Sequence, residues 1–118
     1  MLQLPTVRGL ILCEQAIVDV RTRNTTLVNT VSRLRCPSFP SPPVRFVVYA
    51  ILTDGLGDAE MSLVVSRLDT LEDIHEARWQ MKFPDPLRLI RVILRLSHLS
   101  FPEPVRYQFS LLADGDEV

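Results

Sequence analysis

The chain has 118 residues, of which 47% are apolar, and a formal net charge of −1. This length is typical of a single domain that buries its core without disulfides or a structural metal. The near-neutral charge gives no bulk electrostatic support for a nucleic-acid partner, and no apolar run approaches 18 residues, so no membrane-spanning helix is expected.

The first third of the chain predicts two strands joined by a polar turn. Val7–Cys13 is apolar and predicts a strand, with extension to Val20 after a bulge as the alternative. Arg21–Asn24 is the turn, in which Asn24 suits a left-handed position. Thr25–Leu34 is rich in β-branched residues and is expected to form the second strand.

A proline-rich connector follows at Arg35–Pro43, with four prolines in nine residues. Proline donates no hydrogen bond to a sheet and fixes φ, so neither strand nor helix is expected there. Its length suits a crossing from one sheet to the other.

The next stretch is the one around which the chain is organised, and it predicts a long β-hairpin. Val44–Thr53 is apolar on both faces, which is typical of a central strand. Ala59–Leu68 alternates apolar and polar residues, as a half-buried strand does. The loop Asp54–Asp58 contains Gly55 and Gly57, which take positive φ at little cost, so the two arms are expected to pair.

Asp69–Phe83 is ambiguous between helix and strand. Its first residues resemble a helix start, and some apolar positions fall at helical spacing. The alternative is a loop, with at most one helical turn at Thr70–Asp73, followed by a strand at Ile74–Phe83 that alternates cleanly. We favour the strand, whose inward face comprises His75, Ala77, Trp79, Met81 and Phe83.

The last third predicts two more strands, Leu87–Leu96 and Val105–Ala113, separated by a loop at Ser97–Pro104. Asp114-Gly115 is a turn signal, and residues 116–118 should begin another strand. Because that strand would be cut short at Val118, we expect Val105–Ala113 to lack part of its pairing and to attract another chain or a native tail.

Seven strands with turns about ten residues apart predict a single all-β domain over residues 1–118, an antiparallel β-sandwich of Greek-key or immunoglobulin-like topology. The apolar faces of the predicted strands define its core. The expected core residues are Phe46, Val48, Leu63, Val65, Trp79, Val92, Leu94, Tyr107 and Phe109.

These strands, turns and Phe-Pro motifs follow one another in an order that resembles that of a known family. The residues that carry the likeness are Gly9–Leu34, Ser38-Phe39-Pro40, Arg45–Val48, Leu99–Pro102, Arg106–Phe109 and Asp114-Gly115. They resemble a family of small bacterial proteins classed as a domain of unknown function. The resemblance implies a β-sandwich and no activity, and it implies one more strand after the Asp-Gly turn, so that the native chain would continue past Val118.

Tyr107 begins a strand that also resembles the penultimate strand of immunoglobulin-like sandwiches. That likeness implies a buried tyrosine whose hydroxyl bonds to backbone at the sheet corner. The alternative is an ordinary core tyrosine that reaches solvent at the sheet edge.

Few residues suggest catalysis. His75 lies in phase with the apolar face of its strand, and His98 is expected in a loop beside two serines, a sequence neighbourhood that does not make a catalytic triad. Cys13 in a strand and Cys36 in the connector are expected to be reduced thiols, with a disulfide as the alternative. Trp79 is expected to anchor the core, and a binding platform would require it to be exposed.

Two weaker site hypotheses remain open. Loops at one end of a sandwich could bring Asp54, Asp58, Asp114 and Asp116 together as a weak cation site, although aspartates also simply suit hairpin turns. Arginines on strands could form a cationic face, or a solvated face paired with Glu60, Glu76 or Glu103. These arginines are Arg45, Arg78, Arg91, Arg95 and Arg106.

The sequence therefore favours a cytoplasmic, non-catalytic interaction or accessory module that acts through an edge strand or an exposed sheet face. Its partner would be another protein or a second copy, with no nucleic acid, membrane, cofactor or metal. The alternative is a ligand-binding sandwich for a carbohydrate or a weak cation, using the loops at the Asp54–Asp58 end. No catalytic, cofactor-binding or metal-binding residue is predicted.

Overall fold

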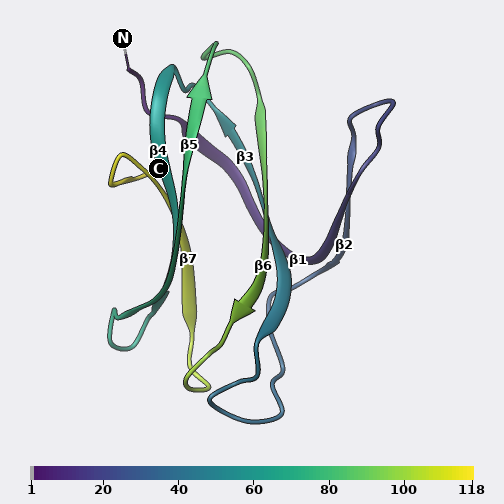
Figure 1. Ribbon diagram of the computed structural model, residues 1–118, viewed down its shortest axis with the longest axis vertical. Coiled ribbons are helices and arrows are strands. Elements are labelled where there is room, and N and C mark those ends of the chain that lie inside the picture. Colours follow the sequence, from purple (N-terminus) through teal and green to yellow (C-terminus); the bar gives the residue numbers. More distant parts are fainter. Residues whose placement is uncertain (1) are drawn as a thin grey trace. The chain divides into compact units, whose positions relative to one another are not determined.

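The computed structural model describes residues 2–118, which form eight strands and no helix (Figure 1). The strands make two four-stranded antiparallel sheets, in the orders β2-β1-β3-β6 and β5-β4-β7-β8. The predicted all-β antiparallel class is confirmed, and two such sheets are consistent with a β-sandwich. The bounds are β1 Thr6–Val18, β2 Thr25–Thr30, β3 Val44–Thr53, β4 Gly57–Arg67, β5 Asp73–Phe83, β6 Ile90–Leu99, β7 Tyr107–Ala113 and β8 Asp116–Glu117.

The chain divides into two compact units. The first comprises Leu52–Ile90, Pro104–Val118 and the N-terminal segment that ends at Arg8. The second comprises Gly9–Ile51 and Arg91–Glu103. The expectation of a single domain stays a prediction.

In the first unit, β4 is the central strand and pairs with β5 on one side and β7 on the other. Its alternate residues are buried, because successive side chains of a strand point to opposite faces. These residues are Ala59, Met61, Leu63 and Val65. They supply the apolar side of this sheet, and the intervening residues face outward.

The hairpin predicted from Val44–Leu68 is wrong. β3 and β4 have the expected positions but belong to different sheets. The segment between them makes other contacts: Leu56 exchanges two backbone hydrogen bonds with Gln3, and the Asp54 amide donates to the Pro86 carbonyl. The loop therefore carries the chain from one sheet into the other.

The two glycines of this loop have different roles. Gly57 has the expected positive φ, 89°. Gly55 does not, and the left-handed residue is Asp54, with φ 66°. A Cβ atom on Gly55 would lie 2.6 Å from ring atoms of Phe83. Glycine is therefore needed at position 55 so that the Phe83 side chain can pack against the loop backbone.

The true hairpin of this unit joins β4 to β5, and it settles the ambiguity at Asp69–Phe83 in favour of a strand. The Arg67 amide donates to the Glu72 carbonyl, and Leu71 takes φ 62°, so the suggested helical turn at Thr70–Asp73 does not form. The inward face of β5 is confirmed, but Trp79 is only half-buried because β5 is an edge strand.

Strand β3 of the second unit is buried on both faces, as its apolar pattern predicts. Phe46 and Val48 are buried on one face. On the other, Val47 forms a small cluster with Cys13 and Ala16, against which Leu27 and Ile93 pack.

Strands β1 and β2 form a hairpin whose ends differ from the prediction. β1 continues to Val18 without a register shift, and β2 ends at Thr30 instead of Leu34. The left-handed residue of the turn is Arg23, with φ 64°, and not Asn24. Arg91 of β6 holds this turn by donating to the Arg23 carbonyl and to Thr25 Oγ1.

The proline-rich connector is tied to the second Phe-Pro segment. The Ser41 amide donates to the Phe101 carbonyl, and the Phe101 amide donates to Ser41 Oγ, both at 2.8 Å. Ser100 Oγ donates to the Ser41 carbonyl. Ser41 is buried, and these hydrogen bonds satisfy its polar groups, whereas the neighbouring connector residues are mostly exposed.

The last strands are shorter or shifted relative to the prediction. β6 begins at Ile90, after a turn at Pro84–Leu89, and β7 begins at Tyr107. Residues 116–117 form β8, which pairs with Leu112 and Ala113. Leu94, Tyr107 and Phe109 are half-buried, whereas the other predicted core residues apart from Trp79 are buried.

Candidate interaction surfaces

The aspartates proposed as a cation site are not brought together. Asp54 pairs with Arg8, with 3.0 Å between the guanidinium nitrogen and the carboxylate oxygen. Asp114 Oδ1 accepts a hydrogen bond of 2.9 Å from the Glu60 amide. Within residues 2–118, no three His, Cys, Asp or Glu side chains are arranged to hold a metal ion.

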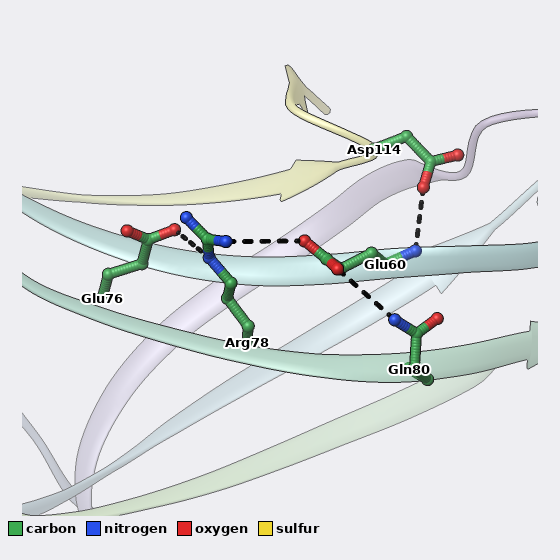
Figure 2. Close-up of polar contacts among 5 residues, drawn as sticks. All are labelled: Glu60, Glu76, Arg78, Gln80 and Asp114. Carbon is green, nitrogen blue, oxygen red and sulfur yellow. Dashed lines mark hydrogen bonds and ion pairs between the residues drawn. The ribbon is translucent and has the colours of Figure 1, made fainter.

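The outer face of the β5–β4–β7 sheet carries a polar network (Figure 2). Arg78 Nε lies 2.6 Å from Glu76 Oε1, and its terminal nitrogen lies 4.0 Å from Glu60 Oε1. Gln80 donates to the second oxygen of Glu60 at 3.4 Å. The hydrogen bond and the negative charge of Glu76 raise the pKa of Arg78, and the charge of Glu60 raises it by a smaller amount. Because this face is exposed, the network contributes little to stability and forms a charged, solvated surface.

The arginines singled out in the sequence do not share one face. Arg78 lies on β5 and is paired, as the solvated alternative expects. Arg45, Arg91 and Arg95 lie in the other sheet, on β3 and β6. Arg106 precedes β7. The five-residue cationic face is therefore wrong, because sequence alternation gives the face of a strand and not the sheet that contains it.

Neither histidine lies in a catalytic arrangement. His75 is half-buried on β5, opposite Val65. His98 lies on β6 and is exposed, so the predicted loop position is wrong. In the described part of the chain, neither histidine side chain makes a hydrogen bond or an ion pair. Ser100, near His98 in sequence, instead donates to the Ser41 carbonyl.

The two cysteines are free thiols in different surroundings. Cys13 is completely buried in the β1–β3 cluster, and burial raises the pKa of its thiol. Cys36 is half-buried in the connector. The predicted positions, one in an apolar strand and one in a loop, are confirmed.

The sheet orders identify the edge strands. They are β2 and β6 in one sheet and β5 and β8 in the other. β7, which the sequence predicts to lack part of its pairing, has β4 on one side and the two-residue β8 on the other, and β8 pairs with Leu112 and Ala113. β6 was not recognised as an edge because its sequence alternates like any half-buried strand, and no local signal reports how many neighbours a strand has.

Strand β6 combines an apolar face with a basic one. Val92 is buried, and Leu94 and Leu96 are half-buried. On the alternate positions, Arg91 and Arg95 are exposed and flank Ile93. Charged residues at such positions are a common way of keeping an edge strand from aggregating, and they also select what pairs with it.

Comparison with known proteins gives one match. The model of a family of unknown function, DUF6941, matches residues 8–118. No curated protein and no solved structure matches the chain. The family match confirms the resemblance to a domain of unknown function that the sequence motifs indicate. No described helix is long and apolar enough to cross a membrane.

Proposed function

We propose that this chain, which belongs to the DUF6941 family of unknown function, is a non-catalytic interaction module that binds a protein partner through the edge strand β6. The observation that carries the proposal is the position of β6. It is a strand of 10 residues at the edge of its sheet, with β3 as its neighbour. Such an edge presents main-chain donors and acceptors to which an added strand binds.

The other edges offer less to a partner strand. β8 has 2 residues and β2 has 6. β5 has 11 residues, but its outward Glu76 and Arg78 already pair with each other, so this edge offers a partner strand less uncompensated charge than β6. β6 offers length, an apolar face and a basic face together.

The proposal is tested by hydrogen exchange on the full chain, alone and in the complex recovered from cells that produce it. If β6 is the binding edge, the partner slows exchange of β6 amides and leaves β5 amides unchanged. β5 serves as the internal reference, because it is the other long edge strand. Protection confined to β5, or to the outer face drawn in Figure 2, would contradict the proposal.

A variant supplies the second arm of the test. Leu94→Lys places a charge on the half-buried face of β6 that a partner would contact. Binding should fall, while circular dichroism of the unbound chain shows that it still folds. The matched control is Met81→Lys, a half-buried position on the edge strand β5, which should bind normally. A homo-oligomer, a carbohydrate ligand, a cytoplasmic location and a bacterial source stay predictions.

A further inference from the structure

The two units carry opposite charge. The second unit contains seven arginines against three acidic residues, a formal charge of +4. The first contains six basic residues against eleven acidic ones, a formal charge of −5, and together they give the net −1 of the chain. The small net charge therefore conceals a basic unit, and β6 from Arg91 onward belongs to it.

The arginines of β6 are not neutralised by carboxylates. The Arg95 side chain makes no hydrogen bond or ion pair within residues 2–118. Arg91 uses its guanidinium to bind the Arg23 carbonyl and Thr25 Oγ1, both uncharged groups. Two nearby acids have other partners: Glu14 accepts from Asn29, and Asp19 accepts from the Arg21 amide. The edge therefore presents two positive charges on one face.

An added strand would set its side chains opposite these residues. Residues that face each other across two strands lie about 5 Å apart, and opposite charges there stabilise the pair whereas like charges destabilise it. Carboxylates four residues apart would therefore face Arg91 and Arg95, with the position between them on that face opposite Ile93. Apolar side chains between them would fall on the face of Val92 and Leu94.

The chain's own strands do not supply this pattern. Antiparallel pairing of two β6 strands centred on Ile93 sets Arg91 against Arg95, and centring on Arg95 sets that residue against itself. The outward face of β5 carries one carboxylate, Glu76, against Arg78 and Lys82, so it offers no second carboxylate to the β6 edge. β2 carries no charged residue, and β8 is too short.

We infer that the occupant of the β6 edge is an extended segment of another protein, with carboxylates four residues apart on one face and apolar side chains on the other. This inference rests on the proposed function and names the chemistry of its partner. Arg91 and Arg95 are the residues that select it.

The test uses three synthetic peptides of about eight residues, a usual strand length. They alternate valine with glutamate, threonine or lysine. Binding to the full chain is measured by fluorescence anisotropy at two salt concentrations, and hydrogen exchange locates the site. The glutamate peptide should bind roughly threefold to tenfold more tightly than the threonine peptide at low salt, because exposed pairs are individually weak, and the lysine peptide most weakly.

Two charge reversals accompany the peptides. Arg95→Glu leaves one positive and one negative charge on this face, so the preference for the glutamate peptide should disappear and the three peptides should bind about equally. Arg33→Glu is the matched control: it changes the charge of the same unit equally but follows β2, at the opposite edge of the sheet. It should leave the order of the three peptides unchanged.

The outcomes separate the two proposals. Equal protection of β6 by all three peptides would overturn the acidic partner and leave β6 as a binding edge. Failure of every peptide to protect β6 would overturn both. Protection of β6 by concentrating the chain alone would make a second copy the occupant, and equal competition by single-stranded DNA would indicate a general polyanion surface. Either result would overturn the inference.

Discussion

Gly55 cannot carry a Cβ atom without a clash, because the side chain of Phe83 packs against it. The residue is buried, and a Cβ atom there would lie 2.6 Å from Cγ and Cδ1 of Phe83 and 3.2 Å from its Cβ. These atoms lie near the base of the phenylalanine side chain, so a rotation of the ring tip does not relieve the contact. The loop and the end of β5 therefore fit together only with glycine.

Gly55→Ala should lower the free energy of unfolding by about 1–3 kcal/mol, as overpacking does. Urea denaturation followed by circular dichroism measures it. The matched control is Gly9→Ala, where a Cβ meets nothing within 4 Å and φ is not left-handed. That change should lie within about 1 kcal/mol of the wild type, in the stabilising direction. Equal losses in the two variants would show that glycine is not needed for close approach.

Ser41 is a buried polar residue whose hydroxyl accepts the Phe101 amide at 2.8 Å. Ser41→Ala removes this buried hydrogen bond to the Phe101 amide, so the free energy of unfolding should fall by about 1–3 kcal/mol. Ser38→Ala, at an exposed serine of the same connector, should change it little. Chemical denaturation of both variants tests the contrast, and a loss at Ser38 as large as that at Ser41 would refute it.

Residue types predicted turns better than they predicted individual backbone angles. Asn24 and Gly55 tolerate positive φ, yet Arg23 and Asp54 adopt it. The position of the left-handed residue depends on which amides and carbonyls close the turn. In the β1–β2 turn, the Asp19 amide donates to the Asn24 carbonyl, and the Arg23 amide donates to the Asp19 carbonyl. Those bonds place Arg23 where the chain must reverse.

At the scale of elements, Asp19 organises the β1–β2 turn. Its Oδ1 accepts from the Arg21 amide at 2.8 Å and from the Thr22 amide at 3.1 Å. These two bonds lower the pKa of Asp19, and the bond from the Thr22 amide has the larger effect. A carboxyl whose folded pKa lies below its unfolded value stabilises the folded turn above the unfolded pKa, about 3.9, and loses that effect as pH falls through the folded pKa.

Nuclear magnetic resonance titration of Asp19 should therefore give a pKa below the usual range. Exchange of the Arg21 and Thr22 amides should quicken as the pH falls through it. Asp19→Asn keeps an acceptor oxygen but does not titrate, so the acid-dependent change at these two amides should disappear in that variant. If the change persists in the variant, another group controls the turn.

Strand β5, Asp73–Phe83, shows what the local alternation of side chains predicts and what it does not. Clean alternation over the strand correctly predicted β5 and its inward face. The same alternation placed Trp79 in the core, but Trp79 is half-buried because β5 has a strand on one side only. Burial at a sheet edge depends on the missing neighbour, which no residue of β5 encodes.

At the scale of the whole molecule, the two thiols report opening of the second unit. Cys13 has no exposed surface, and Cys36 is half-buried. The native chain should therefore react with a thiol reagent at Cys36 and not at Cys13, whose raised pKa also disfavours the reactive thiolate.

Cys36→Ser isolates the slow thiol. Its labelling rate should rise with urea in parallel with unfolding, because Cys13 becomes accessible only when the cluster around Val47 opens. Cys13→Ser serves as the fast control. Rapid labelling of Cys13 in native buffer would contradict its burial.

The sequence by itself determined that this chain is all-β, where most of its strands lie and which face of each is apolar, because side-chain alternation is a local property of extended backbone. The tertiary structure decided which strands pair: it placed β3 and β4 in different sheets and left β6 at an edge. Pairing depends on hydrogen bonds and packing between residues far apart in sequence, such as Leu56 with Gln3 and Gly55 with Phe83, and local periodicity contains no record of those partners.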